Sequence, residues 1–215
     1  MTHIRKTLLE QNNATVAFLR SNDFRALESS ILALSCYNQT FPDEGLTAKD
    51  QSSGSMDEYM LLSPITDRES SGGSGTTFIY NHAIIIRTTT AAEIDPTVLA
   101  YILVFNAALA HHQLAEHNSV CHCTRMHLLT RAKQLYELAY ESCDLEHNPL
   151  FQFALINNIA VIERDIGNVS TADDCFEYLL TIFIVFVDQG CELRLQRVSG
   201  FVVNVPLAIK NAPAA

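Results

Sequence analysis

The sequence predicts an all-α protein built from antiparallel helical hairpins, with one long disordered loop and a small β element. Apolar residues recur at helical spacing in four long segments, at about 97–116, 125–146, 149–166 and 170–189. Proline stands at the start of two of these segments and glycine after the end of two, where both residues are compatible with a helix boundary. The hydrophobic fraction of 48% and the charged fraction of 18% fit a folded chain with a sizeable core.

Residues 1–40 should form the first helical hairpin. Apolar residues recur at helical spacing in 5–20 and again in 23–36. Between these two stretches, the Ser-Asn-Asp sequence at 21–23 supplies both a stop signal and an N-cap signal. We therefore expect a turn at this point and two antiparallel helices on either side of it.

Residues 41–77 differ in composition from both flanking regions. They are rich in serine, glycine and acidic residues, and the run from Ser70 to Gly75 consists of serine and glycine. Such a stretch buries too little apolar surface to offset the entropy of ordering it, so we expect a disordered linker. Its Ser63-Pro64 dipeptide is either a phosphorylation site or a chance occurrence.

Residues 78–92 begin with a β-branched and aromatic run at 78–90, which favours an extended strand. A single strand is not stable in water, so this one needs a partner. The C-terminal segment, 191–215, contains two further stretches of extended character, at 191–198 and 201–205. We expect these stretches to form a small β element that covers the helices.

Residues 93–190 should form the remaining helical hairpins. Pro96 and Pro149 stand at the starts of two helices, where the missing N–H costs nothing. Gly167 and Asn168 separate the last two helices, because this pair favours a helix end followed by a new start.

One sequence pattern occurs three times along the chain. In each copy an asparagine precedes three core positions, spaced by four residues and then by three. The gap from the asparagine to the first core position is about 14 residues in the first and last copies, and about 12 residues longer in the middle copy. The insertion covers roughly residues 116–127. The copies are Asn13 with Leu27, Ile31 and Leu34; Asn106 with Ala132, Tyr136 and Ala139; and Asn158 with Ala172, Phe176 and Leu179.

This arrangement resembles the tetratricopeptide repeat (TPR), whose helical hairpins recur about every 34 residues. The resemblance implies that small residues let two helices approach, that an aromatic residue fills the space between hairpins, and that a glycine closes the first helix. The first copy lacks the glycine and the aromatic residue, and an ordinary antiparallel bundle is the alternative. The matching positions are Ala108, Ala132, Ala139, Ala160, Ala172, Tyr136, Phe176 and Gly167.

The resemblance implies a function in protein–protein interaction. In TPR domains the first helices line a concave groove that takes an extended peptide or a helix of another protein. The corresponding positions here are Asn13, Asn106 and Asn158, whose side chains offer the donors and the acceptor that suit a peptide backbone. The alternative is that each asparagine bonds a neighbouring loop of its own chain.

A clamp for a C-terminal carboxylate, as found in chaperone-binding TPR domains, is not supported. Such a clamp needs basic residues beside the asparagines. The residue one helical turn before each asparagine is apolar: Leu9, Ile102 and Ala154.

The composition argues against nucleic-acid and membrane partners. The net charge is −10, with 14 basic and 24 acidic residues, whereas phosphate binding needs clustered basic side chains. The longest apolar runs, 98–110 and 179–187, fall short of the roughly 20 residues that span a bilayer. The N-terminal residues also lack the apolar core of a secretory signal. We expect a soluble, cytoplasmic protein, with a nuclear location left open, that binds another protein.

The best candidate for metal chemistry is a stretch rich in histidine and cysteine. Its weak candidate ligands are His117, Cys121, Cys123 and His127, because zinc prefers thiolate and imidazole ligands. The Cys-x-Cys spacing is tighter than in the usual zinc-binding pairs, so zinc binding is a lesser alternative to a polar interhelix loop. The sequence has no phosphate-binding loop, nucleophile elbow or metalloprotease motif. We expect neither enzymatic activity nor a cofactor.

A structural role through self-association is the second functional interpretation. Residues 181–187 are apolar on nearly all sides of the predicted helix, so this helix should be buried on several faces. If the C-terminal segment does not cover it, a second copy of the chain can, and the protein would form a homo-oligomer.

Overall fold

The computed structural model describes residues 10, 12–17, 79–80, 83–84, 96–117, 120–142, 149–188 and 204. This part of the chain is predominantly helical and contains no strand, in agreement with the predicted all-α class. Its long helices are α4 (Pro96–Ala115), α5 (His122–Ser142), α6 (Pro149–Asp165) and α7 (Val169–Asp188). A further helical piece covers residues 10 and 12–17.

The sequence-predicted boundaries agree closely with α4, α6 and α7, whereas α5 begins earlier than predicted. Residues 143–148, which include the predicted end of this helix, lie outside the described ranges. Its early start follows from the main chain, because the N–H of Arg125 already donates to the carbonyl of Cys121 at 2.9 Å. No helix among the described residues has the length and apolar character needed to cross a lipid bilayer.

Several predicted segments lie wholly or mainly outside the described residues. These are the first hairpin (1–40) except for 10 and 12–17, the linker (41–77), and the C-terminal segment (191–215) except for Asn204. The predicted strand at 78–90 is described at residues 79–80 and 83–84, and none of these residues belongs to a strand. At Tyr80 and Ile84, asparagine side chains take the place of a second strand, as shown below.

The described residues belong to two compact units, which we treat separately. Unit 1 contains α4, α5, the helical residues 12–17, and the pair 83–84. Unit 2 contains α6, α7, the pair 79–80, and Asn204.

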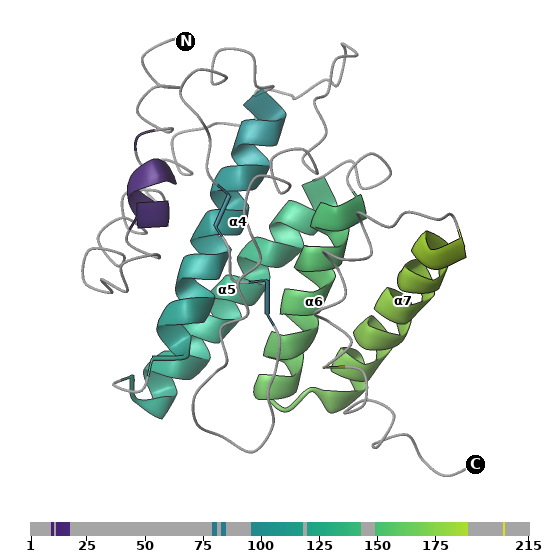
Figure 1. The fold of residues 1–215 in the computed structure, drawn as a ribbon. Coiled ribbons are helices and arrows are strands. Elements are labelled where there is room, and N and C mark those ends of the chain that lie inside the picture. Colours follow the sequence, from purple (N-terminus) through teal and green to yellow (C-terminus); the bar gives the residue numbers. More distant parts are fainter. Residues whose placement is uncertain are drawn as a thin grey trace. The chain divides into compact units, whose positions relative to one another are not determined.

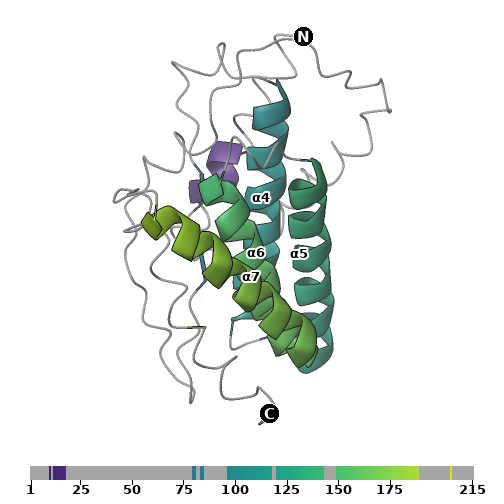
Figure 2. The ribbon, with the colours of Figure 1, turned by 90° about the vertical axis from the view of Figure 1, so that its right-hand side faces the viewer.

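In unit 1, α4 and α5 pack along each other as two consecutive helices (Figures 1 and 2). The alanines at the TPR-like positions, Ala108, Ala132 and Ala139, are fully or almost fully buried and allow this close approach. The rings of Phe105 and Tyr136 fill the remaining space, with their centroids 5.8 Å apart.

In unit 2, α6 packs against α7 in the same way (Figures 1 and 2). The TPR-like positions Ala160, Ala172 and Phe176 are all fully buried, and so is Leu179, which stands where the repeat pattern has a small residue. Most of α6 is buried between Leu150 and Glu163, so a buried polar side chain in this helix must find its partners inside the protein.

Gly167 ends α6 in the left-handed region of backbone conformation, with φ of 93°. Its N–H donates to the carbonyl of Arg164 at 3.0 Å, and the N–H of Asn168 donates to the carbonyl of Glu163 at 2.8 Å. This pair of bonds is the Schellman motif, which satisfies the last carbonyls of the helix. The prediction that Gly167 closes the helix is confirmed.

Replacing Gly167 with alanine should lower the free energy of unfolding of unit 2 by about 1 kcal/mol. An added Cβ would have no atom within 4 Å, so the cost comes from the positive φ and not from a clash. Gly167→Asn should cost less, because asparagine tolerates this conformation better. Urea unfolding would measure both changes, and equal stability of G167A and the wild type would contradict the prediction.

Candidate functional site

Five asparagines are fully buried among the described residues: Asn12, Asn106, Asn157, Asn158 and Asn204. A buried amide without a hydrogen bond costs about 1–3 kcal/mol, so such groups are nearly always paired. Each of these five side chains bonds either to another of the five or to the main chain. They form one group in each unit.

In unit 1, the side chain of Asn106 on α4 holds the main chain of Ile84 at two points. The N–H of Ile84 donates to Oδ1 of Asn106 at 2.8 Å, and Nδ2 of Asn106 donates to the carbonyl of Ile84 at 2.9 Å. The same Nδ2 also donates to Oδ1 of Asn12 at 2.6 Å, and Nδ2 of Asn12 lies 3.3 Å from the carbonyl of Ile84. We call Asn12 and Asn106 together the Asn106 clamp.

The residues held by this clamp also bury their side chains. Ala83 is 7% exposed and Ile84 is 2% exposed. The clamp bonds main-chain atoms alone, so it does not distinguish one side chain from another. Apolar burial of the Ala83 and Ile84 side chains adds to these main-chain bonds.

In unit 2, Asn158 on α6 holds Tyr80 by the same two bonds, and we call this the Asn158 clamp. The N–H of Tyr80 donates to Oδ1 of Asn158 at 2.9 Å, and Nδ2 of Asn158 donates to the carbonyl of Tyr80 at 3.1 Å. The ring of Tyr80 meets that of Phe153 edge-on, with centroids 6.4 Å apart and an angle of 83° between the planes. Burial raises the pKa of the Tyr80 phenol above its ordinary value.

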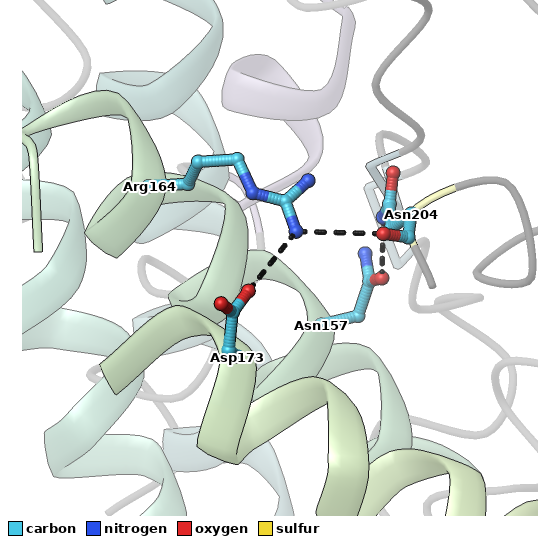
Figure 3. Close-up of polar contacts among 4 residues, drawn as sticks. All are labelled: Asn157, Arg164, Asp173 and Asn204. Carbon is cyan, nitrogen blue, oxygen red and sulfur yellow. Dashed lines mark hydrogen bonds and ion pairs between the residues drawn. The ribbon is translucent and has the colours of Figure 1, made fainter. Parts of the chain in front are cut away.

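The neighbouring Asn157 extends this polar group towards Asn204. Nδ2 of Asn204 donates to Oδ1 of Asn157 at 2.9 Å, and Nη2 of Arg164 donates to the carbonyl of Asn204 at 3.4 Å. Figure 3 shows the guanidinium of Arg164 between this carbonyl and the carboxylate of Asp173, which lies 4.0 Å away. Arg164 also stacks on Phe176, with its Cζ 4.5 Å from the ring centroid.

Replacing Arg164 with alanine should lower the free energy of unfolding of unit 2 by about 1–2 kcal/mol, because it removes the stacking on Phe176 and the buried aliphatic stem. Asp173→Asn should change it little, since an ion pair at 4.0 Å is weak. Urea unfolding of the two variants would compare these contributions. A larger loss in D173N than in R164A would contradict the assignment of the stabilisation to Phe176 stacking.

Each clamp copies the contact that one residue of a β-strand makes with its neighbour. In a hydrogen-bonded antiparallel pair, the N–H and C=O of one residue both bond the residue opposite. Here the side-chain amide of Asn106 or Asn158 supplies the acceptor and the donor. The arrangement can therefore hold an extended main chain.

The asparagines expected from the sequence play different parts. Asn106 and Asn158 do hold a peptide backbone, but it is the backbone of their own chain, as in the alternative of a neighbouring loop. Asn13 is partly exposed and lies 3.4 Å from Nδ2 of Asn12, which is the residue that reaches Asn106 and Ile84. Ile102 and Ala154, one turn before the clamp residues, are fully buried and apolar.

Sequence reasoning missed Asn12, Asn157 and Asn204. A signal for the first two was present, because the chain has the doublets Asn12-Asn13 and Asn157-Asn158 within segments predicted to be helical. Two adjacent amides in a buried helix each need a partner, and the two side chains point in different directions. No comparable signal marks Asn204.

The histidine- and cysteine-rich stretch does not assemble a metal site within the described residues. The candidate ligands His117, Cys121, Cys123 and His127 are all exposed. No group of three or more His, Cys, Asp or Glu side chains in the described ranges is placed to hold a metal ion. Cys121 precedes α5, and a hydrogen bond with the Thr124 hydroxyl at 3.1 Å lowers the pKa of its thiol.

Comparison with known proteins leaves these contacts as the basis for assigning a function. No family model matches the sequence, and no curated protein and no solved structure matches the chain.

Proposed function

We propose that this protein is a TPR-like interaction module, a scaffold or adaptor that binds an extended peptide of another protein. Each unit contributes a binding surface of its own: the face of α4 that carries the Asn106 clamp in unit 1, and the face of α6 that carries the Asn158 clamp in unit 2. The observation that supports this most is that both helices present a buried side-chain amide that bonds the N–H and the C=O of one residue.

The clamps favour an extended peptide over a partner helix. In an α-helix the main-chain N–H and C=O groups are already bonded within the helix, except at its ends. An extended chain has these groups free on one side at every second residue. A two-point contact with one residue therefore suits an extended ligand.

Affinity purification of the tagged protein from its own cells, followed by mass spectrometry, would test the proposal. We expect a partner in stoichiometric amount. Ile84→Pro removes the chain's own N–H from the Asn106 clamp. In this background, capture should fall at least about tenfold when Asn106→Ala is added, because the added change removes both bonds that the clamp can make to the partner. Since both residues are buried, capture is compared per folded protein, with the folded fraction measured by circular dichroism.

Gln152→Ala is the matched control on α6. It also removes a side-chain amide, but the amide of Gln152 is near the surface and bonds the hydroxyl of Tyr178 at 3.1 Å. Capture by Q152A should equal that of the wild type. Recovery of the wild-type protein without a partner, or equal capture by folded I84P and by folded I84P with Asn106→Ala, would contradict the proposal.

Self-association is the second candidate function, and exposed apolar residues on α7 favour it. Ile184, Val185 and Val187 are 52%, 45% and 49% exposed, although they belong to the run 181–187, which is apolar on nearly all sides of the helix. A second copy of the chain could bury them. Sedimentation should then show a concentration-dependent dimer that Ile184→Lys dissociates, and a monomer at all concentrations would exclude this role.

A further inference from the structure

The residues held by the two clamps lie close together in the sequence, and we call the described residues 79–80 and 83–84 the internal segment. Tyr80 occupies the clamp of unit 2, and Ile84 occupies the clamp of unit 1. Its described residues belong to no helix and no strand. The clamp faces of α4 and α6 are therefore occupied by the chain itself.

The contacts made by the internal segment are those of a ligand rather than of a helix or a sheet. At Ile84 the clamp bonds the main chain at 2.8 and 2.9 Å, and any extended residue other than proline offers the same two groups. The side chains of Ala83 and Ile84 contribute apolar burial, and the ring of Tyr80 packs edge-on against Phe153. A peptide with the same pattern can make every one of these contacts.

We propose that the internal segment is a built-in ligand that competes with the partner peptide, so that the partner carries a similar extended apolar pattern and binds by replacing it. This inference rests on the proposed function. Exchange conserves the hydrogen bonds, because the partner's N–H and C=O take the place of those of Ile84 or Tyr80. The clamps therefore stay satisfied in both states.

The affinity of the protein for the partner peptide then depends on competition with the internal segment. A segment tethered to its site acts at an effective concentration on the order of millimolar. A free peptide with equal intrinsic affinity must exceed this concentration to displace it. The wild-type protein should therefore bind such a peptide weakly, and a protein with an impaired internal segment should bind it well.

The test uses a fluorescein-labelled synthetic peptide with the sequence of residues 78–86 and the full-length protein. Ile84→Pro removes the N–H that donates to Asn106 but leaves the Asn106 clamp intact. Fluorescence polarisation should show at least about tenfold tighter binding to I84P than to the wild type. The double variant I84P with Asn106→Ala should lose this gain.

A matched peptide tests the contact itself. N-methylation at the residue that corresponds to Ile84 removes the same N–H from the ligand, and it should weaken binding to I84P at least about tenfold. Equal binding of the methylated and unmethylated peptides would overturn the proposal, as would equal binding of the peptide to I84P and the wild type.

Because Ile84 is buried, I84P can lose stability, and this outcome is also informative. The peptide should then raise the melting temperature of I84P, since it restores the missing contacts. The milder variant Ile84→Ala keeps the N–H and should show the same gain in binding to a smaller degree. Failure of the peptide to bind or stabilise either variant would overturn the proposal.

The outcomes separate this inference from the proposed function. A partner captured in cells together with a peptide that fails to bind I84P would leave the interaction function standing without a built-in ligand. A peptide that binds I84P as expected, with no partner recovered from cells, would establish the exchangeable segment and remove the proposed function.

Discussion

Replacing Asn106 with alanine should lower the free energy of unfolding of unit 1 by about 3 kcal/mol. The variant leaves two buried groups without their partner, the N–H of Ile84 and Oδ1 of Asn12. Each such group costs about 1–3 kcal/mol. The carbonyl of Ile84 retains the longer bond from Asn12 at 3.3 Å. The loss in free energy of unfolding should therefore be smaller than three unpaired groups would cause.

Asn106→Asp distinguishes the donor from the acceptor of the clamp. Aspartate keeps an acceptor for the N–H of Ile84 but loses both donor contacts, and it places a carboxylate oxygen against two other oxygens. Burial of the unpaired charge adds to the cost, so N106D should be at least as destabilised as N106A.

Urea unfolding followed by circular dichroism would measure these changes, with Asn13→Ala as the control. Asn13 is the neighbouring asparagine of the same doublet, but it is partly exposed and its contact with Asn12 is 3.4 Å long. N13A should therefore lose less than about 1 kcal/mol. A free energy of unfolding for N106A within this margin of the wild type would show that the clamp contributes little to stability.

The helices could be predicted from the sequence because their determinants are local. Apolar spacing defines α4, α6 and α7, and Pro96, Pro149 and Gly167 define their ends. The start of α5 was harder, since Cys121 caps the helix through its carbonyl and its side chain is not a usual N-cap residue.

The segment that occupies the two clamps could not be predicted from local sequence patterns. The repeat pattern located Asn106 and Asn158, and amide chemistry predicted that they would hold a backbone. Which backbone they hold depends on a segment 22 residues from Asn106 in one case and 78 residues from Asn158 in the other. Strand propensity placed this segment in a β element, because the β-branched and aromatic pattern is the same whether the partner is a strand or an amide side chain.

His112 on α4 is fully buried, and neither of its ring nitrogens has a hydrogen-bond partner among the described residues. Its ring meets that of Tyr136 edge-on, with centroids 6.1 Å apart. Burial lowers the pKa of His112 to about 4, and the positive charge of Arg125 on α5 acts in the same direction. The pKa of the adjacent His111 is also lowered to about 4, by burial and then by Arg131 and His127.

Unit 1 should lose about 3 kcal/mol of stability through His112 as the pH falls from 7 to 4. In this interval the unfolded chain, with a histidine pKa near 6.5, binds a proton that the folded protein does not. Stability therefore falls as the pH drops below about 6.5, and the loss levels off below about 4. His111 should add to the loss in the same direction.

His112→Phe should remove this part of the pH dependence and should not destabilise the protein at neutral pH. Phenylalanine keeps an aromatic ring against Tyr136 and eliminates two buried nitrogens that have no hydrogen-bond partner in the described part of the chain, so a gain of about 1 kcal/mol at pH 7 is expected. Urea unfolding between pH 7.5 and pH 4.5 would compare H112F with the wild type and with His117→Phe, in which the replaced histidine is exposed. The advantage of H112F should widen steadily as the pH falls, whereas H117F should follow the wild type. A wild-type slope in H112F would show that His112 is not held neutral in the folded protein, and marked destabilisation at pH 7 would show that its nitrogens do have partners.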